Sequence, residues 1–172
     1  HIVTEKIVWI TGSDYEELAH LRSTYGQDLV NQSCVELARI IGEEAVSAAF
    51  ARNPFFFGRV LRIILQMGWQ NGTLNFVANF WELSDIISPA VFREAFAKDM
   101  KETIMAFFFI DSMSRTSSGR LRFRKLYNSL RDIFPAEKFI QGFINNPMDT
   151  IMAYEHMGIN PAIFHRIFAK KG

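Results

Sequence analysis

Two histidines near the C-terminus are the side chains of this sequence best placed to bind a cofactor. His156 and His165 both lie among apolar residues, and Tyr154 is close to the first of them. A neutral imidazole in apolar surroundings can serve as an axial ligand of haem, although such a histidine more often bonds to a carbonyl or a carboxylate. One function that the sequence allows is therefore a sensor that holds haem or another apolar ligand in a pocket lined by Phe, Met and Trp. The residues that we assign to this pocket are Trp69, Trp81, Tyr154, His156 and His165.

The remaining polar residues form no catalytic or metal-binding pattern. Glu17 and His20 have the i, i+3 spacing of one half of a di-iron site, but no second copy of this pair follows. The four histidines are too scattered for a zinc motif, and no serine has the neighbours of an activated nucleophile. Gly12 follows an apolar stretch as in a nucleotide-binding turn, yet carboxylates stand where the phosphates would bind. We therefore predict no catalytic residue, no metal site and a protein that works by binding.

The strongest local feature is a run of basic residues that begins at Arg115 and ends before Asp132. Apolar residues within it recur at helical spacing, so we expect a helix over about 120–133 that buries one face and carries arginines at its rim. Its partner would be an acidic protein surface, or alternatively a nucleic-acid backbone or an anionic membrane contacted through the basic helix 120–131. The simplest structural alternative is a solvated face paired with acidic residues nearer the N-terminus. The residues that we assign to partner binding are Arg120, Arg122, Arg124, Lys125 and Arg131.

Charge is unevenly distributed along the chain, although the net charge is only +1. Residues 1–50 carry eight acidic and three basic side chains, whereas residues 115–172 carry four acidic and ten basic ones. This asymmetry can orient a partner or favour head-to-tail self-association. The small net charge argues against a dedicated nucleic-acid-binding domain.

Cysteine usage and hydropathy indicate the compartment. The single cysteine, Cys34, excludes an intramolecular disulfide and lies in an apolar stretch, so we expect a buried, inert thiol. No run of residues has the pattern of a signal peptide, and the longest uncharged run, 63–81, is interrupted by amides and glycines. We therefore expect a soluble protein of the cytoplasm.

Prolines divide the chain into helices. Four of the five follow Asn or Ser, residues that cap a helix well, and proline is tolerated at the first helical position. We expect an all-α fold, a single compact orthogonal bundle of about nine or ten helices over residues 13–172. Residues 1–12 are expected to form an extended N-terminal arm, because 2–10 are rich in β-branched residues. The helices are expected at about 13–24, 27–41, 43–51, 54–70, 73–83, 89–113, 120–133, 135–145, 147–157 and 161–170.

No internal repeat is expected, because the Phe triplets at 55–57 and 107–109 have dissimilar flanks. The 17 phenylalanines predict a core rich in rings. These observations favour a non-enzymatic regulatory or scaffolding module that binds another protein or itself. Its contacts are expected at the basic helix 120–131 and at the segment 2–10.

Overall fold

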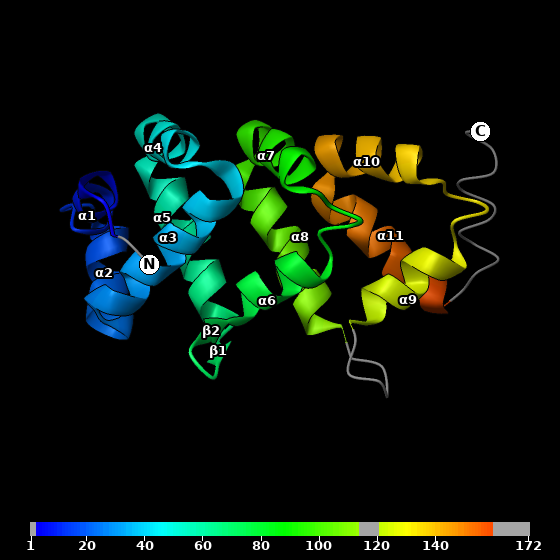
Figure 1. Ribbon diagram of the computed structural model, residues 1–172, viewed down its shortest axis with the longest axis horizontal. Helices are drawn as coiled ribbons and strands as arrows, with labels where there is room; N and C mark the ends of the chain where they lie inside the picture. The colour runs from blue at the N-terminus through cyan, green and yellow to red at the C-terminus, as the bar shows by residue number, and fades with distance from the viewer. Residues whose placement is uncertain (1–2, 114–120, 160–172) are drawn as a thin grey trace.

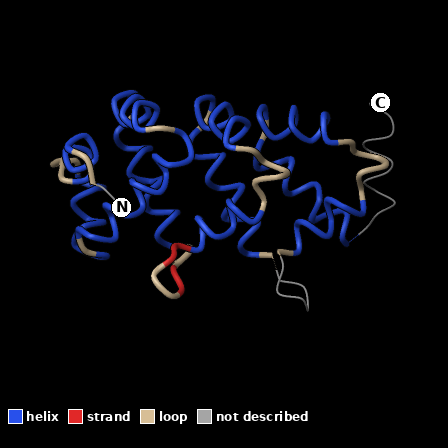
Figure 2. Tube along the Cα trace, in the orientation of Figure 1, coloured by secondary structure: helices blue, strands red, loops and turns tan. Residues whose placement is uncertain are grey.

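The protein is all-α, as its sequence predicts. The computed structural model describes residues 3–113 and 121–159, and Figures 1 and 2 show helices joined by short loops. A two-stranded antiparallel hairpin, β1 (Trp69–Gln70) and β2 (Thr73–Leu74), is the sheet of the described part of the chain. The described residues form eleven helices: α1 (Glu5–Thr11), α2 (Glu16–Tyr25), α3 (Gln27–Ile41), α4 (Glu43–Arg52), α5 (Pro54–Gln66), α6 (Asn75–Glu82), α7 (Pro89–Lys98), α8 (Met100–Ser112), α9 (Arg122–Ser129), α10 (Ala136–Asn145) and α11 (Pro147–Ile159).

The N-terminal segment is helical, so the expected extended arm is wrong. The hydroxyl of Thr4 accepts a hydrogen bond from the amide of Ile7 (3.4 Å) and caps α1. Ile7, Ile10 and Thr11 are buried on one face of this helix, which packs against α3 and α4. β-branched residues disfavour a helix only weakly, and the burial of this face outweighs that preference.

The helix expected over 54–70 is shorter than predicted. The helix that begins at Pro54 ends at Gln66, because the chain then forms the hairpin of β1 and β2. Asn71 and Gly72 turn this hairpin with positive φ angles of 53° and 77°. This Asn-Gly pair is the preferred sequence for a two-residue hairpin turn.

The expected helix over 89–113 is divided at Asp99. The backbone of this residue is extended, and its carboxylate caps α8 by accepting a hydrogen bond from the amide of Glu102 (3.0 Å). Asn53 and Ser88 cap α5 and α7 in the same way, as their positions before proline predict. The expected helix 161–170 lies outside the described residues.

The helices repeat in groups of three, so the expectation of no internal repeat is wrong. The helices α4, α7 and α10 each have 10 residues, and after a single junction residue each is followed by a helix of 13 residues. The junction residues Asn53, Asp99 and Asn146 all have φ near −150°. The period of about 46 residues and the three helices per group are those of helical-repeat proteins. We call α3–α5 unit 1, α6–α8 unit 2 and α9–α11 unit 3.

The buried residues follow the same period. Each unit places a side chain of low exposure at equivalent positions, which we call framework positions. At six of the eight framework positions the residue type changes between units, which hides the repeat in the sequence. Taken in the order of units 1, 2 and 3, these positions are Val30/Phe76/Phe123, Cys34/Phe80/Tyr127, Leu37/Leu83/Leu130, Ile41/Ile87/Phe134, Val46/Phe92/Phe139, Phe50/Phe96/Phe143, Leu61/Phe107/Tyr154 and Ile64/Ile110/Met157.

The units are arranged in a row. Figure 1 shows units 1, 2 and 3 following one another along the longest axis, and the last helices of neighbouring units pack together, α5 on α8 and α8 on α11. The helices α1 and α2 cover the N-terminal end of the row by packing against unit 1. This arrangement buries a continuous core between neighbours, as in other solenoids. Within the described residues, every helix is too short or too polar to cross a membrane.

Candidate protein-interaction surface

Half of the 24 aromatic residues of this protein occupy framework positions and are buried there, whereas a small group is exposed at the N-terminal end. Trp9 is 74% exposed, Tyr15 51% and Phe55 55%. None of these three residues is at a framework position. Phe55 stands where unit 2 has Lys101, so the repeat does not require an apolar residue there. Exposed apolar rings that the fold does not need are typical of interaction surfaces.

An open groove of about 630 Å³ joins two of these rings. We call it the N-terminal groove; it lies between α1, the turn that follows it and the end of α4. A second open groove, of about 500 Å³, shares Tyr15 with the first and extends to Phe55 and α2. The N-terminal groove is lined by Val8, Trp9, Gly12, Ser13, Asp14, Tyr15, Phe50, Ala51 and Pro54.

The rings of the N-terminal groove are arranged around Phe50. The Trp9 ring lies 6.0 Å from that of Phe50 at an interplanar angle of 82°, and the Tyr15 ring lies 5.6 Å away at 87°. Phe50 in turn contacts Phe57, which is fully buried beneath it. The rings of Trp9 and Tyr15 therefore both contact the core at one framework residue, Phe50.

A polar network fixes the turn between α1 and α2 that carries Tyr15. One guanidinium nitrogen of Arg22 donates to the backbone carbonyls of Thr11 (2.7 Å) and Ser13 (2.8 Å). The Thr11 hydroxyl donates to the side-chain oxygen of Asn31 in α3 at 2.6 Å. Because these bonds hold the turn in the absence of any partner, the groove is ordered before binding, which lowers the entropic cost of association.

Carboxylates border the two grooves. Asp14 and Glu16 are exposed, and Glu17 forms an ion pair of 2.7 Å with Arg62 of α5. The N-terminal groove itself is lined by one charged residue, Asp14. The fixed charge of this surface is therefore negative, in agreement with the acidic composition of residues 1–50.

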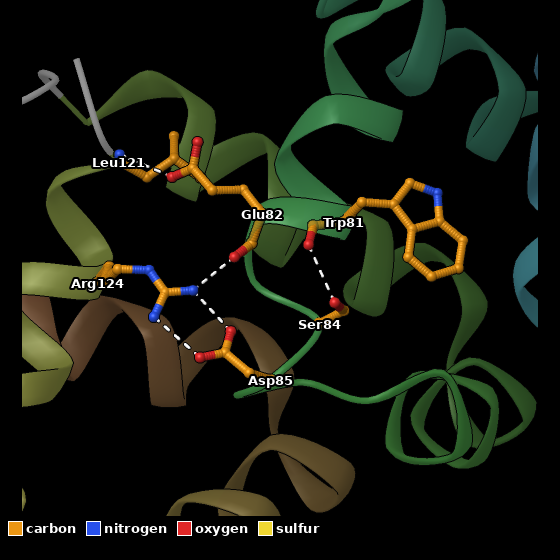
Figure 3. Close-up of polar contacts among 6 residues, drawn as sticks. All are labelled: Trp81, Glu82, Ser84, Asp85, Leu121 and Arg124. Carbon is orange, nitrogen blue, oxygen red and sulfur yellow. Dashed lines mark hydrogen bonds and ion pairs between the residues drawn. The ribbon is translucent and has the colours of Figure 1, made fainter.

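Arg124, one of the basic residues assigned from the sequence, is used within the fold. Its guanidinium donates to both carboxylate oxygens of Asp85 (2.6 and 3.0 Å) and to the backbone carbonyl of Glu82 (Figure 3). The Glu82 carboxylate also accepts a bond from the amide of Leu121 at 2.9 Å. The hydrogen bond to Asp85 raises the pKa of the Arg124 guanidinium above its usual value. These contacts join the start of α9 to the loop after α6, so Arg124 connects units 2 and 3.

The other basic candidates differ in their surroundings. Lys125 and Arg131 are exposed, and the guanidinium of Arg131 lies over the Tyr127 ring, 5.9 Å from its centre. Arg122 is half-buried, and Arg120 lies outside the described residues. A partner-binding role for these four side chains stays a prediction.

The four described residues assigned to a ligand pocket have different surroundings. Tyr154 is fully buried against the rings of unit 3, and burial raises the pKa of its hydroxyl well above the usual range. Trp69 lies exposed in β1, and Trp81 lies exposed in α6, pointing away from Arg124 in Figure 3. His156 is exposed on α11.

His165 lies outside the described residues. None of the four described residues of the assigned ligand set lines the two N-terminal grooves or a third open groove of about 460 Å³ on unit 3. Across residues 3–113 and 121–159, no cluster of three or more His, Cys, Asp or Glu side chains is placed to hold a metal ion. Haem or apolar-ligand binding stays an untested alternative.

The sequence predicts a contact at the segment 2–10, which contains Trp9, but as part of an extended arm. Tyr15 and Phe55 are not identified from the sequence, because nothing in the pattern distinguishes them from core residues. One signal was present: if 5–11 is helical, the face that contains Ile7 and Ile10 leaves Trp9 on the opposite side. No protein-family model, no curated protein and no solved structure matches the chain.

Proposed function

We propose that this protein is a non-enzymatic interaction module that binds a partner protein at its N-terminal groove. The observation that supports the proposal is the exposure of Trp9, Tyr15 and Phe55 on a turn that is already fixed by hydrogen bonds. Aromatic side chains are the usual anchors of protein interfaces, since they combine a large contact area with few rotatable bonds.

The shape of the surface favours a macromolecule over a small ligand. Both grooves are open to solvent, and they adjoin because Tyr15 lines both of them. Small-molecule sites enclose most of their ligand, whereas protein interfaces are broad with an apolar centre and a polar rim. Here the rings form the centre, and Asp14, Glu16 and His20 lie at the rim. A module of this kind would serve a regulatory or scaffolding role.

The proposal is tested by comparing partner binding of two variants. The variant Trp9→Ala/Phe55→Ala removes two exposed rings from the surface. The control, Trp81→Ala, removes a ring of similar exposure (47%) from α6. Proteins that co-purify with the intact chain are identified, and the affinity of the most enriched one is then measured for each variant.

We expect the double variant to weaken binding by at least tenfold, because interface anchors contribute about 2 kcal/mol or more each. The control is expected to bind like the intact chain. Equal affinity of the double variant and the intact chain would show that the partner binds elsewhere. A native mass spectrum of the same preparation tests the alternative function, since a bound haem or apolar ligand would appear as additional mass.

A further inference from the structure

The chemistry of the N-terminal groove indicates which side chain of a partner it binds. We propose that the corner formed by Trp9, Tyr15 and Phe50, together with Asp14, binds the ammonium group of a lysine, free or methylated, on the partner protein. This inference rests on the proposed function and adds the chemical class of the bound group.

The first argument is the arrangement of the rings. The faces of aromatic rings carry partial negative charge and attract cations, and groups of rings bind ammonium ions, including methylated ones. Trp9 and Tyr15 each stand nearly perpendicular to Phe50, at centre-to-centre distances of 6.0 and 5.6 Å. Trp9 and Tyr15 thus stand beside the same buried ring, and their own exposed faces are available to an ammonium group that enters the groove.

The second argument is charge. Asp14 lines the same groove as the three rings, and Glu16 follows Tyr15 directly. No Lys or Arg side chain lines this groove, so its charge is complementary to that of an ammonium group. A carboxylate beside the rings also stabilises the cation after it has lost part of its hydration shell.

The third argument comes from the other exposed rings near this end of the row. The guanidinium of Arg59 lies 5.6 Å from the ring centre of Phe55, and the ammonium of Lys101 lies 5.8 Å from that of Phe56. Among the described residues, no cation lies over Trp9 or Tyr15, although both rings are at least half exposed. These two rings are therefore open to a cation from another molecule.

The test uses Trp9 as its own reporter. The chain has three tryptophans, so the variant Trp69→Phe/Trp81→Phe leaves Trp9 as the single indole. Its fluorescence is titrated with short capped peptides that carry one test residue between two leucines. The test residues are lysine, trimethyllysine, the neutral carbon isostere of trimethyllysine, and glutamate.

We expect the two cationic peptides to bind at least tenfold more tightly than the neutral isostere and the glutamate peptide. Asp14→Asn should weaken the cationic peptides several-fold and leave the isostere unchanged, because only the cation interacts with the carboxylate. The matched control is Asp132→Asn, an exposed aspartate after α9, which should change nothing.

Two results would overturn the inference. If the isostere binds as tightly as trimethyllysine, the groove recognises apolar surface and not charge. If no peptide binds, the corner is not a cation site. Neither result removes the proposed function, which fails only if Trp9→Ala/Phe55→Ala leaves partner binding unchanged.

Discussion

Unit 1 and unit 3 place very different residues at the same framework positions. In unit 3 these positions hold rings, among them Phe123, Tyr127, Phe139 and Tyr154, which contact one another at centre distances of 5.3 to 6.2 Å and are closed to solvent. In unit 1 the equivalent residues are Val30, Cys34, Val46 and Leu61, all fully buried.

Two of the three exposed aromatic residues at the N-terminal end lie instead on added elements, whereas Phe55 lies on α5 of unit 1. Trp9 comes from α1 and Tyr15 from the turn before α2, outside the three units. Rings at framework positions therefore stabilise the fold, whereas the rings of Trp9 and Tyr15 lie outside these positions and are not required by the repeat. This contrast is the physical reason for assigning unit 3 a structural role and the N-terminal groove a binding role.

The largest effect is expected when a ring is removed from unit 3. Phe123→Ala deletes a fully buried ring that contacts Tyr127, Phe139 and Tyr154. We expect the free energy of unfolding to fall by about 3–5 kcal/mol, from lost burial and the cavity that remains. Denaturant unfolding monitors this loss. Phe123→Leu, which keeps most of the volume, should cost about 1.5 kcal/mol or less. Similar values for both variants would mean that the ring cluster is loosely packed.

The second prediction concerns whether the core of unit 1 excludes solvent as well as the core of unit 3. Cys34 occupies the framework position of Tyr127, and burial raises the pKa of its thiol to about 12. At pH 8 we expect a thiol reagent to label Cys34 at least a hundredfold more slowly in the folded chain than in denaturant. Rapid labelling of the folded chain would mean that unit 1 opens locally, and the exposed rings would then reflect instability and not a binding surface.

The same pKa predicts how stability depends on pH. Because the folded thiol keeps its proton up to about pH 12 while an unfolded thiol loses it near pH 9, the unfolded state binds fewer protons between these values. The contribution of Cys34 to stability is therefore complete below pH 9 and decreases as the pH rises towards 12. Cys34→Ala should show a weaker decrease over this range.

The third prediction concerns the connection between units 2 and 3. Arg124→Ala removes both hydrogen bonds to the Asp85 carboxylate and the hydrogen bond to the Glu82 carbonyl. Since charge-assisted bonds to a mostly buried guanidinium are lost, we expect a cost of about 2 kcal/mol in unfolding free energy. Lys125→Ala, on the same helix but exposed, is the control and should cost less than about 0.5 kcal/mol. Equal effects would show that Arg124 contributes no more than a surface charge.

Most helix positions could be predicted from the sequence because they depend on neighbouring residues. The features that could not be predicted depend on contacts between residues far apart in the sequence. Asn53-Pro54 and Ser88-Pro89 identify helix starts because capping involves only neighbouring residues. The role of Arg124 depends on Asp85, 39 residues earlier. The repeat escaped detection because burial constrains apolarity at a framework position and leaves the residue type free, as the set Val46, Phe92 and Phe139 shows.

The exposure of Trp9 could not be predicted for a related reason. An apolar run of four residues, such as 7–10, is compatible with a strand, a buried helix or a helix with one uncovered face. Which of these forms depends on whether other elements cover both faces of α1. In the structure α3 and α4 cover the face of Ile7 and Ile10.

The smallest effect on stability is expected at the N-terminal groove. Trp9→Ala removes a ring that is 74% exposed and touches the core through Phe50, so little buried area is lost. We expect the free energy of unfolding to change by less than about 1 kcal/mol, measured under the same conditions as for Phe123→Ala. A loss of about 3 kcal/mol would mean that Trp9 is a structural anchor of α1. A small loss combined with weakened partner binding would instead place Trp9 among residues kept for recognition, because a protein has no folding advantage in exposing its largest apolar side chain.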